Sequence, residues 1–140
     1  MQVLYTAEAL ASGDGREGHV RSFDGLLEAD LAVPKELGGA GGATNPEQLF
    51  AAGYAACFHS ALRRVARQAR ADVSGSTVIG RVSIGPNSAG GFGLAVELEI
   101  AMPSVERVAA RQLVDRAHQV CPYSNAVRGN VDVALTVVDE

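Results

Sequence analysis

The sequence predicts an α+β protein whose sheets are mostly antiparallel. Its predicted elements follow the order β-β-β-α-β-β-α-β, in which short strands joined by tight turns alternate with two helices. The chain has 140 residues, which suggests a single domain over 1–140 with a hydrophobic core. Apolar residues make up 47% of the chain and charged residues 20%, as is ordinary for a globular protein.

Three strands are predicted before the first helix. Residues 3–10 and 16–23 contain β-branched and aromatic residues in partial alternation, and "SGDG" forms the turn between them. The "DG" pair at 24–25 marks a hairpin to a third strand over 26–33. Residues 34–44, "PKELGGAGGAT", are rich in glycine and predict a loop.

A long helix is predicted over 44–72. Thr44 or Asn45 can cap it, and Pro46 suits its first turn. Glu47 lies three residues after Thr44, in the spacing of a capping box. Small residues share one face of this helix, so we expect another backbone to come close; they are Gly53, Ala56, Cys57, Ser60 and Ala61.

The remaining chain predicts a hairpin, a helix and a closing strand. Strands over 76–86 and 92–103 flank the turn "NSAGG". A second helix over 104–120 can be capped by Ser104, and "CPYSNAVRG" after it predicts a turn or a short helix. The strand over 130–139 alternates cleanly between apolar and polar residues.

Charge and hydropathy argue against nucleic-acid and membrane partners. The net charge is −4, and no basic cluster stands out. No apolar run approaches the roughly 20 residues that a membrane-spanning helix needs. The start "MQVLYTAEAL" lacks the basic and apolar regions of a signal peptide, so we expect a cytoplasmic protein.

Cys57, in "AAGYAACFHSAL", is the first candidate for chemistry. A free cysteine that only packs in the core is the ordinary alternative. A reactive thiol needs a helix N-terminus or a nearby cation to lower its pKa. Cys57 lies about a dozen residues into its helix, beyond the first turn where the helix dipole acts. A reactive Cys57 therefore needs a cation from another element; the candidates are Arg16, Arg21, Arg81 and Arg128.

Cys121 is the second candidate, just before Pro122 at a predicted helix end. It could be a resolving thiol or only a C-cap residue. His118 lies one turn earlier, so His118, Cys121 and Cys57 could also supply three metal ligands. Neither Cys-x-x-Cys nor His-x-x-x-His spacing occurs, so we expect no metal and no bound cofactor. His59 points about 200° away from Cys57 on the helix and cannot be its base.

Two blocks of sequence resemble a known family. "PKELGGAGGATNPEQLFAAGYAACF" (34–58) and "AHQVCPYSNAVRGNVDV" (117–133) are similar to the two signature blocks of the organic hydroperoxide resistance (Ohr) branch of the Ohr/OsmC family. "GDGREGHV" and "GGFGLAVELEI" resemble the family too, so the likeness covers essentially the whole chain. It implies an Ohr/OsmC-like fold, with antiparallel sheets wrapped around two central helices in an intertwined homodimer.

The resemblance implies a thiol peroxidase that reduces organic hydroperoxides to alcohols. The family's peroxidatic cysteine falls on Cys57 and its resolving cysteine on Cys121, which implies a Cys57 sulfenic acid and then a Cys57–Cys121 disulfide. The active-site arginine falls on Arg16, and the glutamate that fixes it falls on Glu47. The resemblance also implies that a lipoylated protein or dihydrolipoamide recycles the disulfide.

Helix spacing adds a geometric expectation. Glu47 and Cys57 are ten residues apart on one predicted helix, or about 15 Å along its axis. One guanidinium cannot easily touch both residues. If Arg16 bridges a glutamate and a cysteine, the two come from different subunits, which predicts an obligate dimer with two shared sites.

Aromatic residues near Cys57 predict a hydrophobic substrate pocket. Phe50 and Tyr54 are the candidate substrate-binding residues, whereas Phe58 and Phe92 are expected to pack in the core. Two alternatives stay open: an OsmC-type peroxidase with a different substrate range, and a non-catalytic module that binds hydroperoxides or lipids. A cysteine hydrolase is weaker, because spacing places no His–Asp or His–Asn pair near Cys57.

Overall fold

The computed structural model describes residues 1–139. The contacts of the chain divide it into two compact units, Met1–Leu49 and Phe50–Glu140. That residues 1–140 act as one domain stays a prediction. No helix among the described residues is long and apolar enough to cross a membrane.

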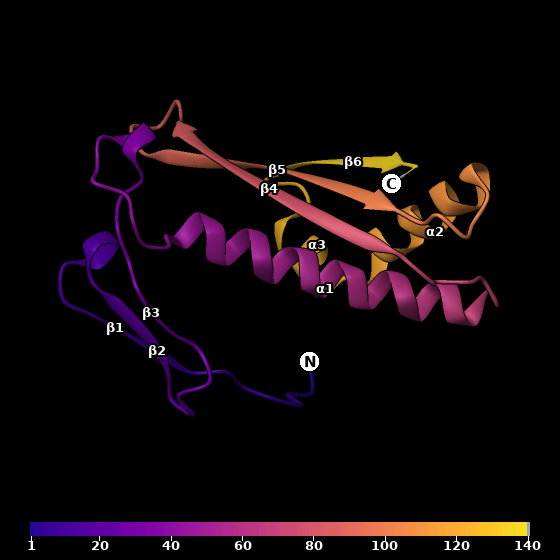
Figure 1. Ribbon diagram of the computed structural model, residues 1–140, viewed down its shortest axis with the longest axis horizontal. Helices are drawn as coiled ribbons and strands as arrows, with labels where there is room; N and C mark the ends of the chain where they lie inside the picture. The colour runs from indigo at the N-terminus through magenta and orange to yellow at the C-terminus, as the bar shows by residue number, and fades with distance from the viewer. Residues whose placement is uncertain (140) are drawn as a thin grey trace. The chain divides into compact units, whose positions relative to one another are not determined.

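A three-stranded antiparallel sheet forms the first unit. Its strands β1 (Ala9–Ser12), β2 (His19–Ser22) and β3 (Glu28–Asp30) pair in chain order (Figure 1). The hairpin predicted at 24–25 is confirmed, because β2 and β3 are antiparallel neighbours.

The first predicted strand is wrong for most of its length, since residues 1–8 form no strand. Ala9 pairs with Ser22, the last residue of β2, so residues before Ala9 run past the point where the chain turns towards β3. The start of the second predicted strand is a short 3₁₀ helix, Gly15–Glu17, and the loop over 34–44 contains another, Lys35–Leu37.

Helix α1 runs from Pro46 to Gln68. Asn45 caps it, because its side-chain oxygen accepts a hydrogen bond of 2.9 Å from the backbone N–H of Gln48. The Thr44 hydroxyl instead donates to the side chain of Gln48 at 2.7 Å. The capping-box interpretation of Glu47 is therefore wrong, and this carboxylate pairs with Arg16.

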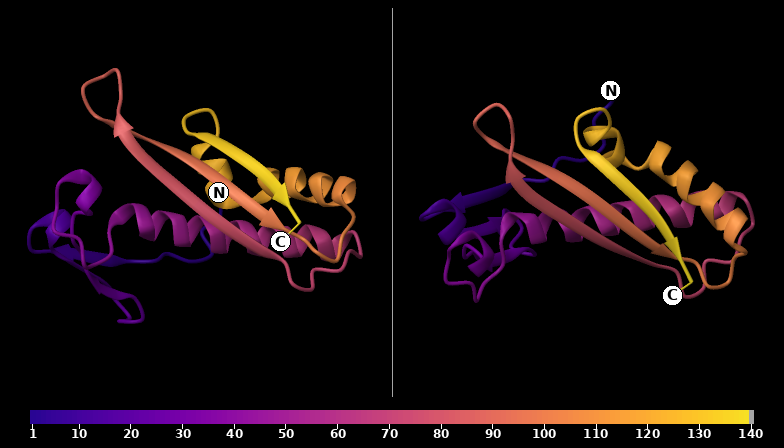
Figure 2. Two further views of the ribbon diagram at one scale, coloured as in Figure 1. Left: turned by 45° about the horizontal axis from the view of Figure 1, so that its top comes forward. Right: turned by 90° about the horizontal axis from the view of Figure 1, so that it is seen from above.

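The second unit contains a mixed sheet beside α1. β4 (Thr77–Pro86) and β5 (Phe92–Ala101) form the predicted antiparallel hairpin. β6 (Asp132–Val138) pairs with β5 in parallel, so the sheet is not wholly antiparallel (Figure 2). A parallel pair needs a long crossover, which α2 (Arg107–Val120) and α3 (Pro122–Val127) supply.

The second helix begins later than predicted because a different residue caps it. The carboxylate of Glu106 accepts hydrogen bonds from the backbone N–H groups of Val108 and Ala109. Ser104 instead donates to the carbonyl of Ser74 at 3.2 Å. α2 ends at Val120, and Pro122 starts α3 in a new direction.

Close backbone approach occurs on a different face of α1 from the one predicted. A Cβ atom added to Gly80 in β4 would lie 2.7 Å from the carbonyl oxygen of Ala51. Gly53, on the predicted face, instead lies under the side chain of Tyr123, whose Oη would be 3.2 Å from an added Cβ. The small residues of α1 therefore serve two contacts, a strand on one side and an aromatic ring on another.

The hydrophobic core lies in the second unit, between α1, β5 and α2. Its largest fully buried apolar side chains are Tyr54, Phe58, Leu62, Leu98, Ile100 and Val114. The core position predicted for Phe58 is confirmed. The one predicted for Phe92 is wrong, because its side chain is 74% exposed beside the turn between β4 and β5.

Candidate active site

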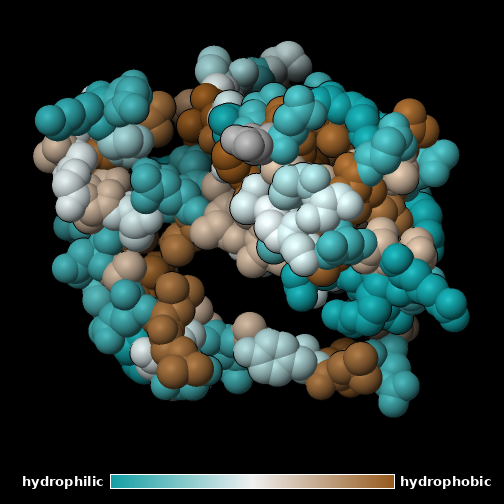
Figure 3. Space-filling view, turned by 45° about the vertical axis from the view of Figure 1, so that its right-hand side comes forward, coloured by the Kyte–Doolittle hydropathy of each residue, from teal (hydrophilic) through white to brown (hydrophobic). Residues whose placement is uncertain are grey.

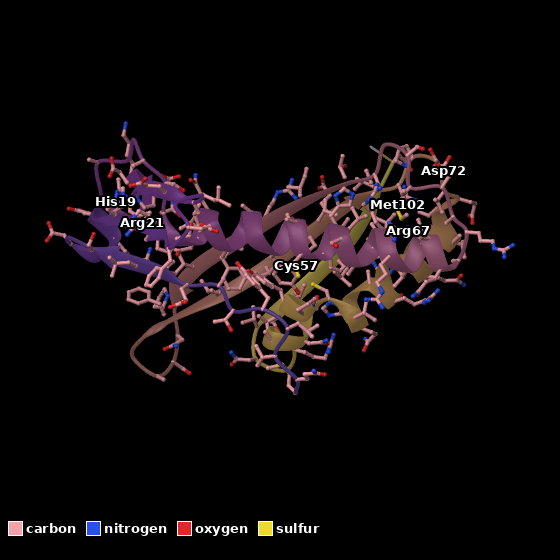
Figure 4. All side chains as sticks on the ribbon, turned by 90° about the horizontal axis from the view of Figure 1, so that it is seen from below. His19, Arg21, Cys57, Arg67, Asp72 and Met102 are labelled. Atoms are coloured by element: carbon pink, nitrogen blue, oxygen red, sulfur yellow. The ribbon has the colours of Figure 1, made fainter. Side chains whose placement is uncertain are left out.

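The two cysteines, 64 residues apart in the chain, lie side by side. Cys57 is midway along α1 (Figure 4), and Cys121 joins α2 to α3. Their Sγ atoms are 3.6 Å apart, and both thiols are free. Cys121 is fully buried, whereas Cys57 is partly exposed. A disulfide bond is about 2.05 Å long, so a small movement of either sulfur would allow the bond to form.

The break between α2 and α3 adds a donor to this site. Pro122 begins α3 directly after Cys121, and the backbone N–H of the next residue, Tyr123, donates to the Cys57 sulfur. The N–H groups of a helix's first turn have no partner within the helix. α3 therefore offers Cys57 one backbone N–H that its own helix does not provide.

Burial dominates the protonation of Cys57. It raises the pKa of the Cys57 thiol above its ordinary value, and the neighbouring Cys121 thiol raises it further. The hydrogen bond from the Tyr123 backbone lowers the pKa but does not cancel the rise. No arginine of residues 50–139 is among the groups that shift it. A reactive thiolate thus needs a cation from outside these residues.

A buried network of hydrogen bonds lies next to the thiol pair and joins the three helices. The Tyr54 hydroxyl and the Ser124 hydroxyl are 2.7 Å apart, and the His118 ring nitrogen Nδ1 lies 2.9 Å from the same Ser124 oxygen. Tyr54 and Ser124 are fully buried. These bonds tie α1, α2 and α3 together around the thiol pair. Sequence reasoning missed the network, although Ser124 stands in the block that contains Cys121.

The His118 side chain therefore has a partner other than a metal. Among residues 1–139, no group of three or more His, Cys, Asp or Glu side chains is arranged to hold a metal ion. Burial and the nearby Arg128 both lower the pKa of His118, which favours its neutral form.

Three aromatic rings cluster beside the thiols. The centroid of Phe50 lies 6.2 Å from those of Tyr54 and Tyr123, and the last two are 5.7 Å apart. Tyr54 is fully buried, whereas Tyr123 is 41% exposed and Phe50 partly exposed. The accessible apolar surface of this cluster thus belongs to Phe50 and Tyr123, and sequence reasoning did not select Tyr123.

The Arg16–Glu47 pair is formed within the first unit. Arg16 lies in the 3₁₀ helix Gly15–Glu17 and Glu47 in the first turn of α1. The guanidinium donates at 2.7 Å to one carboxylate oxygen and at 3.3 Å to the other, a fork-type contact. The side chain of Arg16 stays 41% exposed, so part of its guanidinium is available to another group.

The other candidate arginines have partners of their own. Arg81 donates to Glu97 at 2.9 Å and to Glu99 at 3.2 Å. Arg128 donates to Asn125 and to the backbone carbonyl of His118. Arg21 makes one long bond to the carbonyl of Ser22.

A cleft of about 360 Å³ opens beside Cys57. It lies along α1 and the junction of α2 and α3; its lining residues are Cys57, Ser60, Ala61, Arg64, Val120 and Pro122. The partly exposed Cys57 thus faces a space that a small molecule can enter.

Comparisons with known proteins agree with the motifs. Residues 39–136 match the OsmC-like protein family. An organic hydroperoxide resistance protein from Xanthomonas axonopodis pv. citri is 57% identical over 138 residues, which cover 97% of this chain and 96% of that protein. This chain belongs to the Ohr branch of the Ohr/OsmC family.

Solved structures of Ohr proteins share its fold. An organic hydroperoxide resistance protein from Legionella pneumophila matches with a TM-score of 0.93 and 54% identity, over 97% of this chain and 98% of that one. Another, from Elizabethkingia anophelis, matches with a TM-score of 0.95 and 52% identity over 100% of both chains. The predicted α+β class and Ohr/OsmC fold are confirmed.

Proposed function

We propose that this Ohr-family protein is a thiol peroxidase that reduces organic hydroperoxides to alcohols, with Cys57 as the nucleophile. The observation that supports this most is the pair of free thiols 3.6 Å apart, one of which lines an open cleft. The names of the relatives point to the same substrate class. A cytoplasmic location is part of the proposal, because thiols stay reduced there.

The reaction follows from the two sulfurs. The Cys57 thiolate attacks the distal oxygen of the hydroperoxide, the O–O bond breaks, and the alkoxide leaves as an alcohol after it takes a proton. Cys57 is then a sulfenic acid. The Cys121 thiol attacks that sulfur, water leaves, and a Cys57–Cys121 disulfide forms. A dithiol returns both cysteines to thiols and is itself oxidised; we propose a lipoylated protein or dihydrolipoamide.

Arg16 is the proposed source of the positive charge on Cys57. Glu47 holds Arg16 in its own chain, and Glu47 lies about 15 Å from Cys57 along the axis of α1. We propose that Cys57 receives Arg16 of the partner subunit in a homodimer. The raised pKa of the Cys57 thiol supports the need for such a cation, because burial and the neighbouring Cys121 thiol both favour the protonated form.

Exposed apolar side chains give the dimer a second line of support. In the first unit Leu4 is 91% exposed, Tyr5 79% and Leu10 51%. Brown hydrophobic side chains are open to view on the face drawn in Figure 3. Apolar side chains in such number are normally covered by a partner.

Phe50 and Tyr54 keep separate roles in the proposed substrate site. Phe50 is the accessible ring and would contact the organic group of the hydroperoxide. Tyr54, buried and hydrogen-bonded to Ser124, would form the wall behind it. Such a site favours aryl or fatty hydroperoxides over hydrogen peroxide.

Stopped-flow consumption of cumene hydroperoxide, with dihydrolipoamide as the reductant, tests the proposal. The wild type should turn over, and far faster than with glutathione. Cys57→Ser should lose turnover while its circular dichroism spectrum is unchanged, since serine is nearly isosteric. Cys121→Ser should complete one oxidation and leave a sulfenic acid that dimedone traps.

Three outcomes would each overturn a part of the proposal. Turnover retained in Cys57→Ser would remove Cys57 as the nucleophile. A wild type that binds cumene hydroperoxide without consuming it would instead be a binding module. Peroxide-treated wild type without the mass loss of about two protons per chain would exclude the intramolecular disulfide.

A further inference from the structure

The cleft beside Cys57 has a positive charge at its far end. Arg64 lines the cleft together with Cys57 and lies seven residues further along α1. Seven residues make almost two helical turns, so both side chains share one face of α1, about 10 Å apart along its axis. The reactive sulfur and a guanidinium thus stand at two ends of one open space.

The Arg64 guanidinium is available to a ligand. The side chain is exposed, and it forms no ion pair or hydrogen bond with any other residue among 50–139. Most of the other arginines considered for the site pair with carboxylates or carbonyls, as Arg81 does with Glu97 and Glu99. A guanidinium without a protein partner can bind a carboxylate through two parallel hydrogen bonds.

The wall between these two ends is mostly apolar, with Ser60 as its polar residue. Ala61, Val120 and Pro122 line it, and Val120 is 50% exposed although it is a large aliphatic residue. A ligand that matches the cleft has a peroxide at the sulfur, an aliphatic chain on one side of the peroxide along this wall, and an anionic group at the end of that chain, about 10 Å from the peroxide. The part of the molecule on the other side of the peroxide is then the organic group that Phe50 would contact.

We propose that Arg64 is a specificity-determining residue that binds the carboxylate of a long-chain hydroperoxide. The protein then prefers hydroperoxides of free acids to those of the corresponding neutral esters. This inference rests on the proposed peroxidase function and adds a charge requirement to its substrate. Arg64 takes no part in the redox step, because it binds the end of the substrate far from the peroxide.

α1 itself offers matched controls. Arg63 and Arg67 are also exposed arginines of α1, but neither lines the cleft. Figure 4 shows Arg67 further along the helix than Cys57. Arg63→Gln removes the same charge from the same helix, one residue away from Arg64, so general effects of net charge appear equally in both variants.

The test compares kcat/KM for a long-chain fatty-acid hydroperoxide and its methyl ester, below their micellar concentrations. Arg64→Gln should lower the acid-to-ester ratio about fivefold, the size of an exposed ion pair of about 1 kcal/mol. Arg63→Gln should leave the ratio unchanged. In the wild type the ratio should fall as salt rises, because ions screen exposed charges.

An unchanged ratio in Arg64→Gln, or an equal fall in Arg63→Gln, would overturn the inference. Cumene hydroperoxide, which has no carboxylate, separates this failure from that of the proposed function. If the wild type consumes no cumene hydroperoxide, the peroxidase proposal fails. Calorimetry with the matching hydroxy acid and its ester then still decides whether Arg64 binds the carboxylate.

Discussion

The two compact units of this protein are stabilised in different ways. The second unit buries a continuous set of large apolar side chains from α1, β5 and α2. In the first unit, Leu31 is the buried hydrophobic residue among those described, at 8% exposure. The first unit instead contains ion-pair contacts on its surface, namely Arg16–Glu47 and the contacts of His19 with Glu28 and Asp30.

This difference separates stability from chemistry. A packed core contributes most of the free energy of folding, whereas exposed ion pairs contribute little. The second unit should therefore determine how stable the chain is. The first unit holds Arg16, whose proposed role is to charge Cys57 rather than to stabilise the fold.

The largest expected contrast is between two leucines. Leu62 in α1 is fully buried, whereas Leu26 in the turn after β2 is 89% exposed. Leu62→Ala should lower the free energy of unfolding by about 2–5 kcal/mol, because it leaves a cavity. Leu26→Ala should change it by less than about 0.5 kcal/mol. Urea denaturation followed by circular dichroism measures both, and an equal loss in the two variants would end the contrast.

A smaller effect is expected inside β4. Gly80→Ala should cost about 1–3 kcal/mol, because the new methyl group meets the carbonyl oxygen of Ala51. Gly85 lies in the same strand with nothing within 4 Å of an added Cβ, so Gly85→Ala is the matched control and should not destabilise. Thermal unfolding of both variants tests whether the packing of β4 against α1 contributes to the stability of the second unit.

Arg16→Ala should barely change the stability of the protein but should strongly reduce its activity. The exposed pair with Glu47 is worth less than about 1 kcal/mol, so the unfolding free energy should barely change. Loss of the cation should raise the pKa of Cys57 and slow peroxide reduction at neutral pH tenfold or more. Arg16→Lys should recover little, because an ammonium cannot form the planar fork. Thiolate absorbance near 240 nm, recorded against pH, measures the pKa of Cys57 in each variant. An unchanged Cys57 titration in Arg16→Ala would show that another cation acts on Cys57.

The smallest effect is an opposite pH dependence of two histidines. Hydrogen bonds to Asp30 and Glu28 raise the pKa of His19, so its stabilising contribution is present below its unfolded pKa of 6.5 and is lost as pH rises through the folded value. Burial lowers the pKa of His59, so its contribution is lost as pH falls from 6.5 towards the lower folded value. Melting temperatures of His19→Gln and His59→Gln, measured from pH 5 to 8, should deviate from the wild type in opposite directions. Deviations of the same sign would contradict this assignment.

Local sequence signals were sufficient where an element is determined by its own residues. The alternation in β4, β5 and β6 and the proline at the start of α1 placed those elements within a few residues. Residues 3–10 carry a strand pattern as well, but a strand also needs a neighbour in register, and β2 ends opposite Ala9. The parallel pairing of β6 with β5 could not be predicted from the sequence either, because the alternation of apolar and polar residues does not depend on strand direction.

The site shows the same limit. Family resemblance selected Cys57 and Cys121, which the structure brings together, and Arg16 and Glu47, which pair with each other. It did not select Ser124 or the Tyr123 backbone, because their contacts depend on how α3 turns after Pro122. Arg64 is not among the predicted site residues, because only arginines on other elements were considered as cations for Cys57.

The short distance between the two sulfurs also affects the competition between disulfide formation and overoxidation of Cys57. Under the proposed chemistry, a Cys57 sulfenic acid can be captured by Cys121 or attacked by a second hydroperoxide, which would give an irreversible sulfinic acid. The Cys121 sulfur lies 3.6 Å from the Cys57 sulfur before any rearrangement. This proximity gives the Cys121 thiol an effective concentration that no dissolved peroxide reaches. Because Cys121 is buried, its own thiol is protected from oxidants before it reacts with Cys57. A burst of peroxide would then exhaust the supply of reductant long before it destroyed the protein.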